Sequence, residues 1–176
     1  NNISKWANID PYELLWSNYK GSGYDIACAL AKTPILYKLE DSIPIAKSVQ
    51  FNPDYTKNIF FVYLNKKQDS NKEIDKFFEM KISDLKIKKL SDLTLEFVNS
   101  KTLLDLQNCI KKHENIISET LKTIPVKNKY FNDYKGEIKS LGAWGGDFIL
   151  AAGPINSKKY FYEKGYKTVF NFKEIF

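Results

Sequence analysis

A continuous apolar run, Ile59-Phe60-Phe61-Val62-Tyr63-Leu64, lies in the first half of this chain of 176 residues. Runs of this kind are typical of strands that are buried on both faces of a sheet. We therefore expect residues 59–64 to form a central strand. Other short segments that are rich in apolar residues and bounded by turn residues are expected to be strands as well: 35–39, 43–51, 137–140, 148–152 and 167–170.

Helix start and stop signals separate these strands. Asp10 can cap a helix that has Pro11 at its first position, where proline is favoured. Ser22 is expected to cap a second helix over 23–32, which Thr33-Pro34 ends because the residue before a proline avoids helical angles. Further helices are expected over 70–78, after Ser91, over 103–121, and over 157–164, with Gly165 as the C-terminal cap.

The order of these elements indicates the fold class. Strands and helices alternate without the strict repeat of a parallel sheet, so we expect an α+β fold with an antiparallel sheet covered by helices on one face. With 43% hydrophobic residues, the chain can bury the core of one domain over residues 1–176. Because it begins at Asn1 without a methionine, we interpret it as part of a longer protein.

Composition argues against several classes of protein. No run of about 18 apolar residues is present, which a membrane span would need, and the first residues lack the pattern of a signal peptide. We therefore expect a cytoplasmic protein with no membrane partner. Cys28 and Cys109 lie far apart and His113 is the single histidine, so we expect no metal site built on these residues.

The net charge of +6 raises the possibility of nucleic-acid binding. All 27 basic residues are lysine, however, and the arginine fork that reads guanine edges is absent. We therefore expect no nucleic-acid partner. A mildly positive field would instead attract a small anionic substrate.

The first segment with chemical character is Gly21-Ser22-Gly23-Tyr24-Asp25-Ile26-Ala27. Its glycines would let the backbone approach a ligand, and the following helix would present free N–H groups to an anion. A carboxylate at Asp25 could orient or deprotonate an attacking hydroxyl, or assist a magnesium ion beside phosphates. The alternative is a capped helix whose acidic first-turn residue only stabilises the helix dipole.

The second such segment is Gly142-Ala143-Trp144-Gly145-Gly146-Asp147, between two expected strands. Glycines at this density indicate a turn that needs positive φ angles or an unobstructed backbone, and such a turn can form a nest of N–H groups for a phosphate. A glycine-rich hairpin without a ligand is the alternative. Lys66 and Lys139 could each reach an anionic ligand or could simply be solvated, and His113 is expected to be a packing residue.

Together the two segments resemble motifs of the GHMP kinase superfamily. The first is similar to the Gly-Ser-Gly-aromatic-Asp-Val-Ala stretch of phosphomevalonate kinases, and more loosely to the Ser-Gly-x-Asp of mevalonate kinases. The second resembles the third GHMP motif, Gly-Ala-Gly-Gly-Gly-Asp, although Trp144 replaces a small residue. The pair also resembles a bacterial GHMP-kinase group that is named after its Gly-Tyr-Asp-Ile-Ala string.

The resemblance implies a ferredoxin-like C-terminal GHMP domain in an ATP-dependent kinase that uses Mg²⁺. The acceptor that it favours is phosphomevalonate or a related intermediate of isoprenoid biosynthesis, with mevalonate, homoserine or a sugar as alternatives. The Pro-x3-Gly-Leu-Gly-Ser-Ser phosphate loop of the family occurs nowhere in the sequence, so the resemblance implies a missing N-terminal ATP-binding half and no turnover by residues 1–176 alone. A non-catalytic GHMP-like binding domain is the rival interpretation.

The resemblance also implies roles for individual residues. Asp25 would be the catalytic residue, as a base or as a positioning group. The substrate and phosphate groups would contact Gly21, Ser22, Gly23, Tyr24, Gly142, Ala143, Trp144, Gly145, Gly146 and Asp147.

Overall fold

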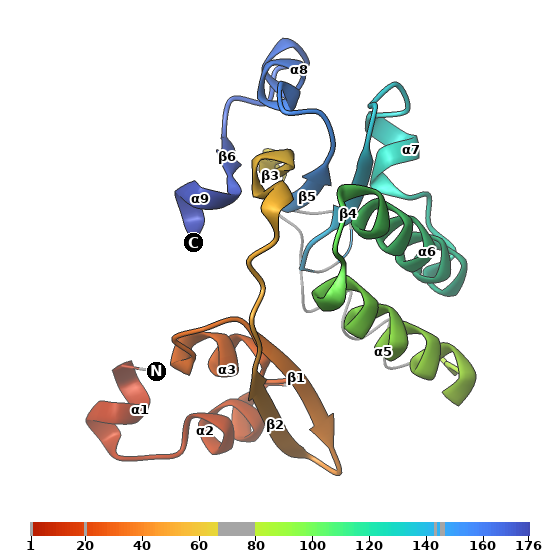
Figure 1. Cartoon of the computed structure of the whole chain (residues 1–176). Coiled ribbons are helices and arrows are strands. Elements are labelled where there is room, and N and C mark those ends of the chain that lie inside the picture. The colour runs from red at the N-terminus through yellow and green to blue at the C-terminus, as the bar shows by residue number, and fades with distance from the viewer. Residues whose placement is uncertain (1, 20, 67–79, 143, 145–146) are drawn as a thin grey trace. The chain divides into compact units, whose positions relative to one another are not determined.

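The computed structural model describes residues 2–19, 21–66, 80–142, 144 and 147–176 (Figure 1). Composition predicts one domain over residues 1–176, and the structure divides the chain into two compact units, Asn1–Phe51 and Asn52–Phe176. The helix expected over 70–78 lies outside the described residues.

The first unit contains three helices and a hairpin among its described residues. The elements are α1 (Asn2–Ala7), α2 (Pro11–Asn18), α3 (Tyr24–Leu30), β1 (Ile35–Glu40) and β2 (Ile43–Ser48). Strands β1 and β2 pair antiparallel, with Tyr37 opposite Ala46. Their turn uses Asp41 and Ser42 at φ angles of 49° and 63°. Both strands were expected, although β2 ends at Ser48 rather than at residue 51.

The cap of α2 confirms its sequence signal. The Asp10 carboxylate accepts hydrogen bonds from the backbone N–H groups of Tyr12 and Glu13, at 2.7 and 3.2 Å. Helix α3 differs from its prediction at both ends. It begins at Tyr24 with Gly23 in the N-cap position, and it ends at Leu30 because Ala31 already has an extended backbone.

The second unit is built on a four-stranded sheet. Its strands are β3 (Ile59–Tyr63), β4 (Glu137–Ser140), β5 (Phe148–Ala152) and β6 (Val169–Asn171), in the order β4-β5-β3-β6. Every neighbouring pair is antiparallel, with Val62 of β3 opposite both Ile149 and Val169. The prediction of a central strand is therefore confirmed. Strand β6 begins at Val169 rather than at residue 167.

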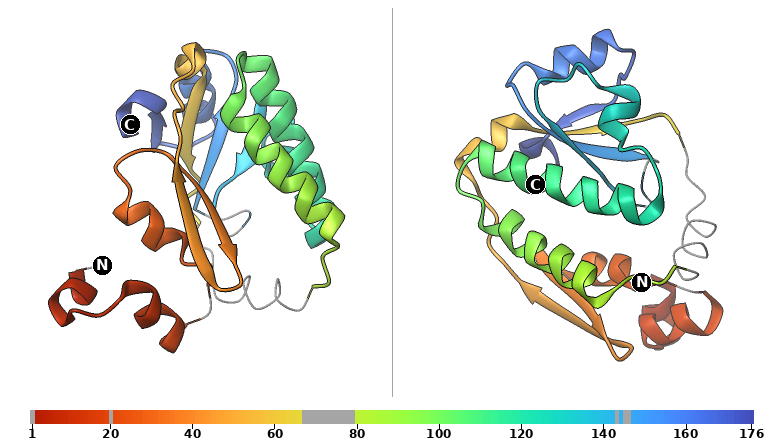
Figure 2. Two further views of the ribbon diagram at one scale, coloured as in Figure 1. Left: turned by 60° about the horizontal axis from the view of Figure 1, so that its bottom comes forward. Right: turned by 90° about the vertical axis from the view of Figure 1, so that its right-hand side faces the viewer.

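Helices cover both faces of this sheet rather than the one face expected. The elements are η1 (Asp54–Asn58), α5 (Asp84–Asn99), α6 (Leu103–Leu121), α7 (Val126–Tyr130), α8 (Ser157–Glu163) and α9 (Phe172–Ile175). The right-hand view of Figure 2 shows α6 on one face and α7 and α8 on the other. A β3 strand that is apolar at consecutive positions needs cover on both sides, which accounts for the difference.

Helix α5 begins at Asp84, well before the expected start at Ser91. Its first turns include the lysine-rich stretch 86–89, which is mostly exposed. Charged residues on the solvent side of an amphipathic helix do not interrupt it. Helix α6 matches its prediction, and its N-terminus has a capping box in which Thr102 and Asp105 bond to each other's backbone N–H groups.

The core of the second unit lies between the sheet and helices α7 and α8. Phe60, Val62, Ile149 and Ala151 pack there with aromatic residues from the segments around both helices: Phe131, Tyr134 and Phe161. The fold is thus a mixed arrangement of helices and antiparallel sheets, as an α+β class requires. Within the described residues, no helix has both the length and the apolar character that crossing a membrane would need.

Candidate functional site

The first motif is a tight connection between α2 and α3. The indole Nε1 of Trp16 donates a hydrogen bond to the carbonyl oxygen of Gly21 at 3.0 Å. The hydroxyl of Tyr37 donates to the carbonyl oxygen of Ser22. Contacts from α2 and from β1 therefore fix the path of the backbone through this motif.

Contacts within the first unit explain why residue 23 is a glycine. Its φ angle is 74°, in the left-handed region, and it occupies the N-cap position expected for Ser22. The Ser22 hydroxyl accepts instead from the N–H of Tyr24, at 3.3 Å. A Cβ atom on residue 23 would lie 2.8 Å from two ring carbons of Tyr12. Packing against Tyr12 and backbone conformation therefore account for Gly23 without a ligand.

Asp25 and Tyr24 occupy the first turn of α3. The Asp25 side chain is exposed and forms no hydrogen bond with the described residues, so its carboxylate is accessible to a ligand. Tyr24 is 48% exposed. A hydrogen bond with Cys28, followed by burial, raises the pKa of Tyr24 to about 12. Its hydroxyl is therefore protonated at neutral pH and can donate a hydrogen bond.

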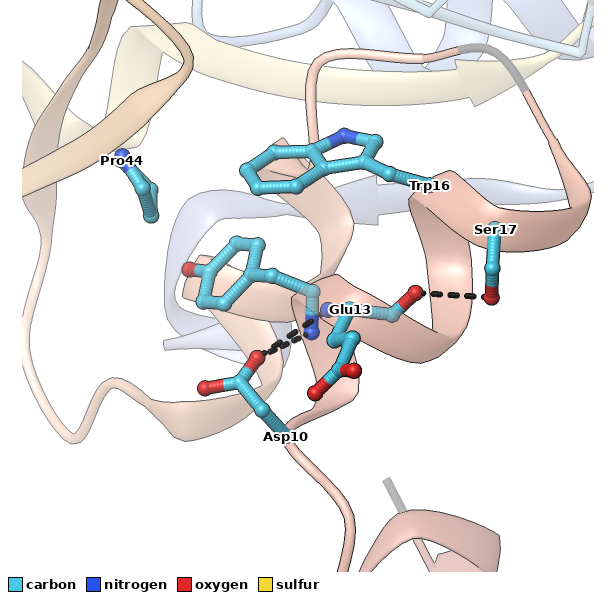
Figure 3. Close-up of a pocket in the computed structure, with 6 residues that line it drawn as sticks. Asp10, Glu13, Trp16, Ser17 and Pro44 are labelled. Carbon is cyan, nitrogen blue, oxygen red and sulfur yellow. Dashed lines mark hydrogen bonds between the residues drawn. The ribbon is translucent and has the colours of Figure 1, made fainter.

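An open hollow of about 590 Å³ lies in the first unit, on Tyr12 and Trp16, two residues that contact the first motif (Figure 3). It is lined by Asp10, Tyr12, Glu13, Trp16, Ser17 and Pro44, and none of these is a predicted site residue. Figure 3 shows the carboxylates of Asp10 and Glu13 on the side away from the Trp16 ring. Two carboxylates repel a phosphate, so this hollow does not suit an anionic substrate.

The second motif forms the turn between β4 and β5. Gly142 and Trp144 have φ angles of 65° and 40°, and the Trp144 N–H donates to the Gly142 carbonyl oxygen at 3.0 Å. The prediction of a turn with positive φ angles is therefore confirmed at these two residues. Among the described residues, a Cβ atom on residue 142 would meet nothing within 4 Å, so none of them fills the space beside this backbone. Ala143, Gly145 and Gly146 lie outside the described residues.

Asp147 connects the end of this turn to the segment after β3. Its N–H donates to the carbonyl oxygen of Lys66 at 3.0 Å, and its carbonyl oxygen accepts from the N–H of Leu64 at 2.7 Å. The regular pairing of β3 and β5 ends at Tyr63 and Phe148, and these two hydrogen bonds join the segment after β3 to Asp147 outside that register. The backbone of Lys66 is held beside the exit of the glycine turn.

A polar cluster lies between β4 and α6. The Ser140 hydroxyl donates to Glu114 Oε2 at 3.0 Å, and His113 Nδ1 lies 3.4 Å from Glu114 Oε1. Within the described part of the chain, those last two atoms are buried without a hydrogen bond. Burial lowers the pKa of Lys139, while the Glu114 carboxylate acts in the opposite direction. Lys139 is therefore a partly buried residue of the sheet–helix contact.

The two motifs lie in different units. Contacts with Tyr12, Trp16 and Tyr37 hold residues 21–23 of the first motif. In the second motif, Asp147 is hydrogen-bonded to Lys66. Among the described residues, no group of three His, Cys, Asp or Glu could hold a metal ion.

Sequence reasoning missed two contacts at these motifs. One is the packing of the Tyr12 ring on Gly23, and the other is a contact between the side chains of Lys66 and Tyr130, at 2.7 Å. The contact between Lys66 and Tyr130 joins residues far apart in sequence. The one sequence signal for it was the position of Lys66, two residues after the expected central strand. No protein-family model matches the chain, and no curated protein matches it either.

Proposed function

We propose that this chain is the acceptor-side part of an ATP-dependent kinase of the GHMP superfamily. Its second unit would then be the ferredoxin-like domain of such an enzyme, working in the cytoplasm with an N-terminal half that binds ATP. The favoured acceptor is phosphomevalonate or a related isoprenoid-pathway intermediate. Mevalonate, homoserine and sugars are the alternative acceptors.

One observation carries this proposal: two family-like motifs occur in the expected order, each on suitable local structure. Gly21-Ser22-Gly23-Tyr24-Asp25 leads into a helix with its carboxylate exposed, and the glycine turn has an open, left-handed backbone at Gly142. A phosphate can approach the backbone closely only where the side chain is small or absent. Trp144 makes this fit less complete than in the family motif.

The acidic residues suit a magnesium nucleotide. Mg²⁺ in kinases is held by one or two carboxylates together with the substrate phosphates, so a dedicated protein cage is not needed. Asp25 is exposed and could supply one such carboxylate from the first unit. Bound MgATP supplies the phosphoryl group that is transferred.

Asp25 would act on the acceptor. Toward a hydroxyl acceptor, its carboxylate oxygen would accept the hydroxyl proton as the oxygen attacks. Toward a phosphate acceptor, which is already ionised at neutral pH, Asp25 would orient the acceptor or assist the metal. Protonated Tyr24, beside Asp25, can donate a hydrogen bond to either kind of acceptor.

A screen of ADP release tests the proposal in the full-length protein. MgATP is supplied with mevalonate, phosphomevalonate, homoserine or a sugar, and the variant Asp25→Asn is compared with the wild type. We expect turnover with one acceptor class and a loss of about 100-fold or more in Asp25→Asn. Asn has nearly the same shape as Asp, so the fold should be unchanged.

Asp41→Asn is the matched control. Asp41 is an exposed acid of the same unit, and its left-handed φ angle of 49° suits asparagine. This variant should keep wild-type turnover. Equal turnover of the wild type, Asp25→Asn and Asp41→Asn would remove Asp25 from the mechanism. The absence of ADP release with every acceptor would favour the non-catalytic binding domain.

A further inference from the structure

Two lysines converge on one tyrosine beside the exit of the glycine turn. The Nζ atom of Lys66 lies 2.7 Å from the hydroxyl oxygen of Tyr130 and 4.6 Å from the centre of its ring. Lys129 comes directly before Tyr130 on α7, and its Nζ atom lies 5.2 Å from the same ring centre. The ring itself packs against the core of the second unit, which fixes its position.

Among the described residues, no acid forms an ion pair with Lys66 or Lys129, the two lysines of this cluster. Lys127, on the same helix, shows the contrast, because its Nζ atom pairs with Glu137 at 2.8 Å. Two ammonium groups that share one neutral phenol leave a local excess of positive charge.

The two lysines change the acidity of the Tyr130 hydroxyl. Hydrogen bonding to Lys66, and next to Lys129, lowers the pKa of Tyr130, while the same contact raises the pKa of Lys66. A more acidic phenol is a stronger hydrogen-bond donor to an anion. The cluster therefore offers two ammonium groups and one hydroxyl, which are the donors that bind phosphate oxygens.

The backbone places this cluster beside the second motif. The carbonyl oxygen of Lys66 accepts from Asp147, so the lysine stem starts at the turn that contains Gly142. We propose that Lys66, Lys129 and Tyr130 bind the phosphate group of a phosphomonoester. This inference rests on the proposed function for the identity of that ester, a phosphorylated acceptor, but not for the binding of phosphate itself.

Inorganic phosphate is the probe, titrated calorimetrically into the full-length protein at constant ionic strength and without nucleotide. Lys66→Met and Lys129→Met should each weaken phosphate binding by about tenfold or more. Lys101→Met is the matched control, because Lys101 is an exposed lysine of the same unit and its loss changes the net charge equally. It should bind phosphate as the wild type does. Equal weakening in all three variants, or in none, would overturn the proposal.

A second measurement does not depend on affinity. A bound phosphate dianion disfavours the phenolate, so phosphate should raise the pKa of Tyr130 in a titration followed by phenolate absorbance. Tyr130→Phe keeps the packed ring and removes the hydroxyl, so the phosphate-dependent part of the titration should disappear. A titration that is the same with and without phosphate would contradict a site at this hydroxyl.

Saturating MgATP separates the two sources of phosphate. If MgATP abolishes phosphate binding at Lys66, the site holds a phosphate of the nucleotide, and the assignment to a phosphomonoester is wrong. If phosphate still binds, the site holds the phosphate of the acceptor. Phosphate binding without any ADP release would refute the kinase and keep the site. ADP release together with unchanged phosphate affinity in Lys66→Met would refute the phosphate site and support the kinase.

Discussion

The two motifs differ in why they contain glycine. At Gly23 the backbone is left-handed and a Cβ atom would collide with Tyr12. At Gly142 the backbone is also left-handed, but no residue that the structure describes lies within 4 Å of a Cβ position. The first glycine is buried by its neighbours and the second is exposed. Glycines in similar sequence contexts can thus serve packing in one motif and leave room beside the backbone in the other.

This difference bears on where a ligand could touch the backbone. Tyr12 already covers Gly23, so a substrate at the first motif would meet side chains such as Asp25 and Tyr24. At Gly142 nothing described lies within 4 Å of a Cβ position, so a phosphate could approach the main chain itself. We therefore expect the first motif to act through its side chains and the second through its backbone.

The largest effect is expected for Gly23→Ala. The variant combines left-handed strain with overpacking against the Tyr12 ring, and it should lower the free energy of unfolding by roughly 2–4 kcal/mol. Urea denaturation followed by tryptophan fluorescence measures this loss. A change below about 1 kcal/mol would mean that Tyr12 does not pack on Gly23.

A double variant separates the two causes. In a Tyr12→Ala background the ring is absent, so Gly23→Ala should retain only the backbone strain of roughly 1–2 kcal/mol. The difference between the two backgrounds measures the steric part. An equal loss in both backgrounds would assign the whole effect to the φ angle of 74°.

A smaller effect is expected for Gly142→Ala. The added Cβ meets no neighbour in the described part of the chain, so only left-handed strain of roughly 1 kcal/mol is expected in urea denaturation. The methyl group would nevertheless occupy the open space beside the turn, so turnover in the full-length enzyme should fall more than stability does. A stability loss as large as that of Gly23→Ala would erase the distinction between the two motifs.

Local signals in the sequence predicted much of the fold. The apolar run of β3, the Asp10 cap of α2 and the hydrophobic spacing of α6 each act over a few residues, and each was placed well. The start of α5 was missed because its first turns are charged and face solvent. Cover on both faces of the sheet was also missed, although the uninterrupted apolar character of β3 already required it.

The candidate site was less predictable because its contacts are not local. Positive φ angles at the second motif followed from its glycines, and they are present at Gly142 and Trp144. The reason for Gly23 depends on the Tyr12 ring, which comes from the preceding helix. The convergence of Lys66 and Tyr130 depends on how α7 packs on the sheet, and no pattern in the sequence encodes that distance.

The smallest effect concerns the side chains of the first motif. Tyr24 has a pKa of about 12 instead of 10.0, and the hydrogen bond with Cys28 is the main cause. Cys28→Ala should therefore bring the pKa of Tyr24 back toward 10.0, but not fully, because burial remains. A phenolate absorbance titration measures the shift, and Tyr24→Phe identifies the signal.

The sign of the accompanying stability change follows from the direction of the pKa shift. A phenol whose pKa is raised in the folded state stabilises the fold below its unfolded value of 10.0, and this contribution is lost as the pH rises toward about 12. Cys28→Ala should therefore lower stability near neutral pH, and it should weaken the dependence of stability on pH between 10.0 and about 12. An unaltered dependence would mean that Cys28 does not hold Tyr24. In that case, Cys28 would not be the contact that orients the Tyr24 side chain beside Asp25.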